Sequence, residues 1–237
     1  MAAYRAAIAA GADMLELDVR LTGDGELVAA HDETISGQRI AQLAAADVME
    51  LTAGAVPTVR DVVELAVGSG VEVMLDLKDI GCEPVLVDLA CSLLPPGRFV
   101  ISTLEDVSVA RISRDRPDIR VGLSLGRGDP EHRVRTRLSE LFPMRRARAC
   151  GARFLSVNEQ LAGLGVIRQA SRAGMAAFVW TVDEPAKLSR WLADPRVEGV
   201  ITNTPRAAVE LLREAPAARP GEVRAAVTRP PRPGGGS

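Results

Sequence analysis

The sequence predicts an α/β barrel of parallel strands, one strand short of the closed (β/α)₈ form. Strand-like and helix-like segments alternate through most of the 237-residue chain. The strand segments are nearly continuous apolar runs, which is typical of parallel sheets covered on both faces. The chain opens on a helix, so no segment stands where the preceding strand of a barrel would be. An open doubly wound sheet is the structural alternative, although the sequence has no Gly-x-Gly-x-x-Gly turn.

The first elements follow from local signals. Residues 2–10 are strong helix formers and are followed by a glycine, which predicts a helix that ends just before a strand at 13–19. Asp24-Gly25 predicts a two-residue hairpin turn that folds residues 26–31 back onto this strand. After a polar turn, a helical stretch is expected around residues 39–51.

The rest of the chain repeats a helix-and-strand unit. Thr58 is the predicted N-cap of a helix, with Asp61 three positions later, and Gly68 and Gly70 end it. Further strands are predicted at 71–77, 98–102, 119–125, 153–157, 176–182 and 197–202, and helices at 84–93, 104–114, 131–149, 160–173, 184–193 and 205–213. We therefore expect one barrel domain over residues 1–214, with seven parallel strands.

The segment 215–237 changes composition to Ala, Pro, Arg and Gly and has little to bury, so we predict a disordered tail.

Composition limits the partners. With 29 Lys and Arg against 31 Asp and Glu, the formal charge is −2, which provides no field for attracting nucleic acid. The aromatic fraction of 3% is too low for base-stacking platforms. No apolar run reaches the roughly 18 residues of a membrane span, and residues 1–10 lack the apolar centre of a signal peptide. We expect a small-molecule substrate, no nucleic-acid partner, no transmembrane segment and a cytoplasmic location.

Two carboxylates stand out in the first strand. Glu16 and Asp18 are two residues apart in an apolar run, so on a strand both leave the same face. Burying charged groups is costly unless they are paired or bind a cation, so a ligand explains this pair better than folding does. The predicted hairpin brings His31 close to both carboxylates.

A second pair, Asp76 and Lys78, has the same spacing on the strand 71–77. Polar residues at the carboxyl ends of barrel strands face the mouth, so these side chains should meet the first pair. Three carboxylates suit one hard divalent cation, Mg²⁺ or Ca²⁺, and the lysine suits an anionic group such as phosphate. The alternative is that Asp76–Lys78 is a buried ion pair that braces the barrel, as Glu16 could with Arg20.

These motifs resemble the glycerophosphodiester phosphodiesterase family, whose fold is a (β/α)₈ TIM barrel of the phospholipase-C-like phosphodiesterase type. The resemblance covers residues 2 to about 213. It is carried by Ala2-Ala-Tyr-Arg-Ala-Ala-Ile-Ala-Ala-Gly-Ala-Asp-Met-Leu-Glu-Leu-Asp-Val19, Thr22-Gly-Asp-Gly-Glu-Leu-Val-Ala-Ala-His-Asp32, Val56-Pro-Thr-Val59, Leu75-Asp-Leu-Lys78, Val179-Trp-Thr-Val182 and Gly199-Val-Ile-Thr-Asn-Thr-Pro205.

The resemblance implies a hydrolase of lipid metabolism that cleaves glycerophosphodiesters into an alcohol and glycerol 3-phosphate. It implies that Glu16, Asp18 and Asp76 bind the metal, that His31 is one of two catalytic histidines and that Lys78 lies on the phosphate side. By the same resemblance Trp180 would line the barrel mouth, and core packing is its alternative.

The sequence departs from the family pattern in several places. The family's opening His-Arg-Gly strand and Pro-Glu-Asn segment have no counterpart, which removes one catalytic histidine and a phosphate-binding arginine. His132 follows a different strand and is expected to be a surface-loop residue. The family more often has Glu where Asp76 stands, and Asp where Asn203 stands. We expect a start placed at an internal methionine, or a gene without the strand, and weak or absent activity in this chain.

Two rival functions remain at this point. Leu75-Asp-Leu-Lys-Asp79 also looks like the Asp-x-Lys-x-x-Asp strand of orotidine monophosphate decarboxylase-type barrels, but Gly81 stands where the third acid should be. The other rival is a non-catalytic barrel that keeps a metal and phosphate pocket.

Overall fold

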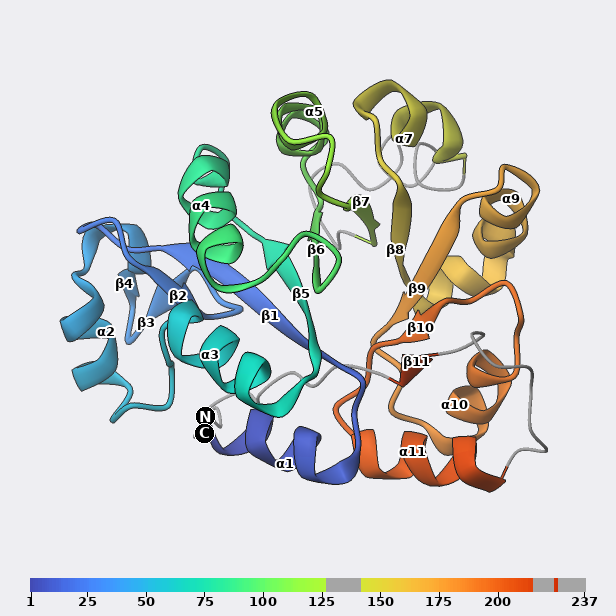
Figure 1. The fold of residues 1–237 in the computed structure, drawn as a ribbon, viewed down its shortest axis with the longest axis horizontal. Coiled ribbons are helices and arrows are strands. Elements are labelled where there is room, and N and C mark those ends of the chain that lie inside the picture. Colours follow the sequence, from blue (N-terminus) through green and yellow to red (C-terminus); the bar gives the residue numbers. More distant parts are fainter. Residues whose placement is uncertain (127–141, 215–223, 226–237) are drawn as a thin grey trace.

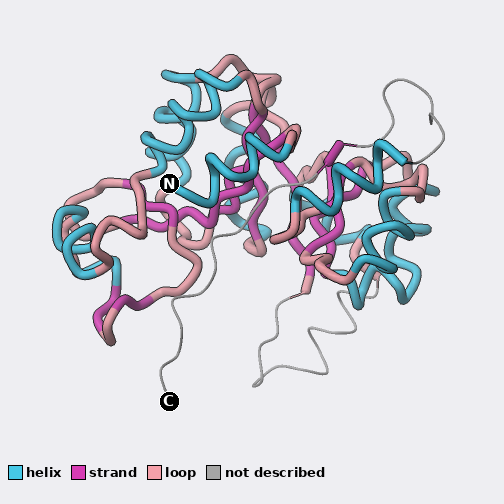
Figure 2. Tube along the Cα trace, turned by 90° about the horizontal axis from the view of Figure 1, so that it is seen from below, coloured by secondary structure: helices cyan, strands magenta, loops and turns pink. Residues whose placement is uncertain are grey.

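The computed structural model describes residues 1–126, 142–214 and 224–225. Within these residues, nine strands form one curled sheet in the order β11-β10-β9-β8-β7-β6-β5-β1-β2. The strands from β1 through β5 to β11 pair in parallel, and β2 pairs antiparallel with β1. Strands occupy the inside and helices the outside (Figures 1 and 2). The predicted parallel α/β barrel class is confirmed, and the open doubly wound sheet is set aside.

The elements have the following bounds. The sheet strands are β1 (Met14–Leu21), β2 (Leu27–Ala29), β5 (Glu72–Leu77), β6 (Phe99–Thr103), β7 (Val121–Leu125), β8 (Phe154–Asn158), β9 (Ala176–Trp180), β10 (Gly199–Val200) and β11 (Arg224–Ala225). The helices are α1 (Ala2–Ala10), α2 (Ala45–Leu51), α3 (Val59–Ser69), α4 (Glu83–Leu93), α5 (Asp106–Asp115), α7 (Met144–Cys150), α8 (Glu159–Leu161), α9 (Ile167–Arg172), α10 (Pro185–Leu192) and α11 (Pro205–Glu214). Of the predicted helix 131–149, residues 131–141 lie outside the described part.

The hairpin after β1 differs from the prediction. The β1–β2 ladder ends at Leu21 and Leu27, so the connection has five residues rather than two. Thr22 Oγ1 donates to Asp24 at 2.5 Å, and the Asp24 carboxylate accepts the Ala45 N–H at the start of α2. Asp24 therefore ties the loop to α2, and it lies inside a tight turn that the Gly25 N–H closes by donating to the Thr22 carbonyl at 3.1 Å.

The segment between β2 and α3 is also more divided than predicted. A small hairpin of β3 (Thr34–Ile35) and β4 (Gln38–Arg39) is followed by a 3₁₀ turn at Ile40–Gln42, and only then by α2. The single helix expected over 39–51 is therefore wrong in its first half. The N-cap of α3 is as predicted, because Thr58 Oγ1 accepts the Asp61 N–H at 3.1 Å.

The ring of helices closes between its first and last members. Helices α1 and α11 follow one another along the lower edge of the view in Figure 1, and they contact each other. The Cα of Gly11, which ends α1 with a positive φ of 92°, faces the Val209 side chain of α11 closely enough that an added Cβ would lie 3.6 Å away. On the strand side, β11 pairs in parallel with β10. Residues 224–225 thus form a strand within the predicted tail, and the rest of 215–237 lies outside the described residues.

Three clusters of buried apolar residues build the interior, of which one packs β2 against residues 40–48, while the other two include the residues of the parallel strands. The larger lies between the sheet and the helices. The smaller includes Met14, Met74, Val100, Phe154, Phe178 and Ile201. In it, Phe154 and Phe178 make an edge-to-face contact with ring centroids 5.4 Å apart.

The smaller cluster fixes where the polar site begins. Two residues after Met14 and Met74 along their strands come Glu16 and Asp76. Because strand side chains on one face recur every second residue, the carboxylates lie directly next to the smaller apolar cluster along each strand. No helix among the described residues has both the length and the apolar character needed to cross a bilayer.

Candidate active site

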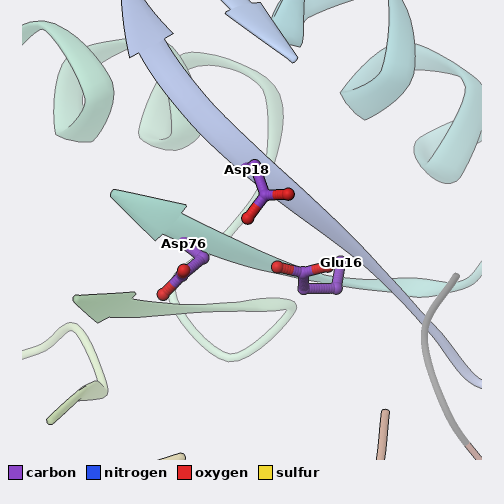
Figure 3. A group of neighbouring side chains, drawn as sticks. All are labelled: Glu16, Asp18 and Asp76. Atoms are coloured by element: carbon purple, nitrogen blue, oxygen red, sulfur yellow. The ribbon is translucent and has the colours of Figure 1, made fainter. Parts of the chain in front are cut away.

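Three carboxylates converge at the carboxyl ends of β1 and β5. The ladder between these strands pairs Asp18 with Asp76 and places Glu16 one pleat earlier. The three side chains point into one space, with a ligand oxygen from each within 4.8 Å of the others (Figure 3). All three residues are buried, at 8 to 9% exposure. The structure therefore brings together the acidic residues that the sequence singled out.

Lys78 joins this group. Its Nζ lies 2.7 Å from Asp18 Oδ1 and also donates to Asp76 Oδ2. Burial alone would lower the pKa of the Lys78 ammonium, but the surrounding Asp76, Asp18 and Glu16 raise it more, so its pKa is held above the ordinary value. The ion pair of the alternative interpretation is thus present. With the carboxylates ionised, three negative charges face one positive charge.

Two serines hold Asp76 in place. Ser102 Oγ on β6 donates to Asp76 Oδ1 at 2.5 Å, and Ser124 Oγ on β7 donates to the same oxygen at 3.2 Å. Both serines are buried. The sequence analysis missed them, although a serine in the middle of an apolar strand is a usable signal, since a buried hydroxyl needs a partner. Through these two serines, the group of polar side chains around Asp76 extends to β6 and β7, the next two strands of the sheet.

The carboxylates fit a hard cation. The donors are all carboxylate oxygens, which Mg²⁺ and Ca²⁺ prefer. Asp76 Oδ1 accepts both serine hydroxyls, which use its two lone pairs, so Oδ2 is the Asp76 oxygen that would bind a cation. Lys78 shares Asp18 Oδ1 and Asp76 Oδ2, so a bound cation would compete with its ammonium for these two oxygens. Glu16, Asp18 and Asp76 are the residues that could hold the ion.

His31 lies beyond the end of β2, with its ring half exposed. The ring contact that the structure shows is with Asp32, whose Oδ1 is 2.6 Å from Nδ1. With a proton on Nδ1, this contact leaves Nε2 available for proton exchange. The carbonyl of His31 accepts two bonds from Arg20, at 3.1 and 3.2 Å. The ion pair that the structure shows for Arg20 is with Asp79, whereas the ion-pair alternative had named Glu16.

Trp180 and Asn203 lie at the ends of the last barrel strands. Trp180 is partly buried and packs on the inner apolar cluster, and its ring lies close to Gly126 at the end of β7. It packs on the core from the last residue of β9, and its role at the barrel mouth stays a prediction. Asn203 Nδ2 donates to Asp183 Oδ2 at 2.8 Å, and its N–H donates to Oδ1. His132 lies outside the described residues.

Comparison with known proteins identifies the family of the chain. The family model described as "Glycerophosphoryl diester phosphodiesterase family" matches residues 1–207. The chain belongs to this family. The family resemblance, and with it the expectation of a phosphodiesterase enzyme, is confirmed.

Relatives agree with the family. A glycerophosphodiester phosphodiesterase of Caldanaerobacter subterraneus subsp. tengcongensis is 26% identical over 237 residues, covering 90% of this chain and 91% of the relative. Glycerophosphodiester phosphodiesterase GDPD4 of Arabidopsis thaliana is 28% identical over 229 residues, covering 86% of this chain and 66% of the relative.

Solved structures share the fold. A glycerophosphodiester phosphodiesterase from Parabacteroides distasonis superposes with a TM-score of 0.71 at 21% identity, covering 88% of this chain and 87% of that one. An Oleispira antarctica phosphodiesterase, solved with its product sn-glycerol-3-phosphate, gives a TM-score of 0.64 at 16% identity, covering 95% and 84%.

Proposed function

We propose that this family member hydrolyses glycerophosphodiesters to an alcohol and glycerol 3-phosphate with the help of one divalent cation, Mg²⁺ or Ca²⁺. The observation that carries the proposal is the convergence of Glu16, Asp18 and Asp76 with Lys78 at the carboxyl end of the barrel. The product found in the Oleispira antarctica relative supports a substrate of this class.

The residues would divide the chemistry as follows. A cation held by the three carboxylates would polarise phosphodiester oxygens and offset charge developing on phosphorus. Lys78, whose ammonium is held charged, would attract the phosphate of the substrate and place it next to the three carboxylates and their cation. Trp180, whose ring lies beside Gly126, would line the mouth of the barrel.

His31 would move the proton. Overall, a water oxygen bonds to phosphorus, the bond from phosphorus to the leaving alkoxide breaks, and a proton reaches that alkoxide. Asp32 holds Nδ1, so Nε2 is the atom that exchanges the proton. Among the described residues His31 is the one histidine, whereas the family resemblance implies two. Losing one of two acid–base groups costs about 10² to 10⁴ in rate. We therefore propose a slow enzyme.

The two histidines of the chain provide a matched test. Purified protein would be incubated with sn-glycero-3-phosphocholine and Mg²⁺, Ca²⁺ or EDTA, and released glycerol 3-phosphate would be measured. Hydrolysis should require the cation and fall at least about 100-fold in His31→Ala, while His132→Ala keeps the wild-type rate. Equal activity with EDTA would contradict the metal dependence. Equal activity of His31→Ala would contradict the assigned proton transfer.

The second candidate is a non-catalytic barrel that binds a metal and a phosphate ester. The Lys78 ion pairs, which give these carboxylates a partner without any ligand, favour it. Calorimetric binding of Mg²⁺ or Ca²⁺ and of glycerol 3-phosphate, with no turnover of any glycerophosphodiester offered, would support this candidate and contradict the enzyme.

A further inference from the structure

We propose that Arg20 and Asp79 form a clamp that positions His31 for proton transfer. This role is assigned neither by the family resemblance nor by the comparisons. It rests on the proposed function, because a positioning residue acts only through the residue that carries out the chemistry.

The Arg20 guanidinium contacts two different segments. Its Nη1 donates to Asp79 Oδ1 at 2.8 Å, while Nε and Nη2 both donate to the His31 carbonyl, at 3.2 and 3.1 Å. The side chain is 14% exposed, and its bond to Asp79 is partly buried, whereas its bonds to the His31 carbonyl are exposed. A planar guanidinium with three donors engaged has little freedom to rotate, and a lysine cannot reproduce this fork.

Asp79 is itself fixed to the sheet. Its Oδ2 accepts the Leu21 N–H at 2.9 Å, so each carboxylate oxygen binds a different group at the end of β1. The preceding residue, Lys78, donates its N–H to the Val19 carbonyl at 3.0 Å, which continues the β1–β5 pairing up to Asp79. Asp79 therefore fixes the Arg20 side chain relative to the sheet.

His31 needs this support because it lies just outside the sheet. The β1–β2 ladder pairs Val19 with Ala29, and the Ala30 N–H donates to the Asp18 carbonyl at 2.9 Å. After Ala30 the chain leaves the strand, and Arg20 holds the His31 carbonyl. Since Asp32 sets the ring by its Nδ1, the location of Nε2 depends on the backbone that Arg20 holds.

A misplacement of a reacting group by about 1 Å can lower a rate about 100-fold. We therefore expect Arg20→Gln to lower kcat about 10- to 100-fold while KM changes less than about threefold. Arg20→Lys, which keeps the charge but not the fork, should recover only part of the loss. Asp79→Asn should also lower kcat. This variant tests the clamp if Arg20→Gln fails to fold.

A matched control separates positioning from structural support. Arg120 makes a bidentate ion pair with Glu198 at the amino ends of β7 and β10. The Arg120 side chain is 33% exposed and that of Glu198 is 26% exposed. Arg120→Gln should lower the thermal midpoint but leave kcat and the pH–rate profile unchanged. An equal kcat loss in Arg120→Gln, or an unchanged kcat in both Arg20→Gln and Asp79→Asn, would overturn the clamp.

A readout without turnover separates this proposal from the proposed function. The ring proton resonances of His31 can be assigned by NMR from their loss in His31→Ala. They should shift or broaden in Arg20→Gln and not in Arg120→Gln. If wild-type protein hydrolyses nothing, the proposed function fails, while these resonances still report whether Arg20 places the ring. Unchanged resonances in Arg20→Gln overturn the clamp.

Discussion

At the residue scale, Lys78 has two opposing effects on the carboxylate cluster. Its ammonium compensates part of the negative charge, and it also occupies Asp18 Oδ1 and Asp76 Oδ2, two of the oxygens that a cation needs. A cation therefore binds against the repulsion of a nearby positive charge, while an anionic substrate gains from that charge.

Replacement of Lys78 should separate these effects. Lys78→Met should tighten Mg²⁺ or Ca²⁺ binding about tenfold, which corresponds to about 1.4 kcal/mol, because the competing charge is gone. The same change should slow hydrolysis. Isothermal titration calorimetry and the hydrolysis assay measure the two quantities. Lys187→Met removes a half-exposed lysine paired with Glu159 and should change neither. Weaker cation binding in Lys78→Met would contradict the competition.

Part of the site could be predicted from sequence. The spacing of two in apolar runs placed Glu16, Asp18 and Asp76 on common faces of neighbouring strands, and the structure brings them together. The roles of Ser102 and Asp79 could not be read in the same way. Their contacts depend on the register between strands that are distant in the chain, and no local pattern specifies that register.

At the element scale, Glu83 joins the first turn of α4 to α5. It is 3% exposed, its Oε1 accepts Ser108 Oγ at 2.5 Å, and its Oε2 accepts Arg111 Nη1 at 3.2 Å. Burial alone would raise the pKa of the Glu83 carboxyl, but the Ser108 hydroxyl, backbone N–H groups and Arg111 lower it more, so its pKa lies below the ordinary value.

This bridge predicts a pH-dependent stability. A carboxyl with a lowered folded-state pKa stabilises the fold above its unfolded pKa, and the contribution disappears as the pH falls through the folded value. Ser108→Ala should therefore lower the free energy of unfolding by about 1 to 2 kcal/mol near pH 7, and the difference should shrink below about pH 4. Urea unfolding at several pH values measures it.

Ser113→Ala is the control for the bridge. Ser113 lies on the same helix and donates to the Gly151 carbonyl at an exposed position. Its removal should cost less, and the cost should not depend on pH between 3 and 7. A Ser108→Ala difference that stays constant over this pH range would contradict the role assigned to Glu83.

The type and order of the barrel strands were predicted correctly, whereas the length of one loop and the bounds of one helix were not. Each predicted barrel strand is present, because long apolar runs between helix signals leave few alternatives. The β1–β2 loop and the split of 39–51 were wrong because tertiary bonds decide them. The Asp24 carboxylate binds the start of α2, and the Gly23 N–H donates to the Leu43 carbonyl at 2.7 Å.

At the scale of the whole molecule, the strand at residues 224–225 adds a last partner to the sheet. β11 pairs with β10, whose other edge pairs with β9, so it covers an edge that β10 would otherwise present unpaired. A variant that ends at Glu214 should show amide exchange at Gly199–Val200 faster by about fivefold or more, because an uncovered edge opens more easily. Exchange in β6, which keeps β5 and β7 as partners, should not change. Hydrogen–deuterium exchange with peptide mass spectrometry measures both segments in one sample, and equal protection of β10 in the two proteins would contradict the pairing.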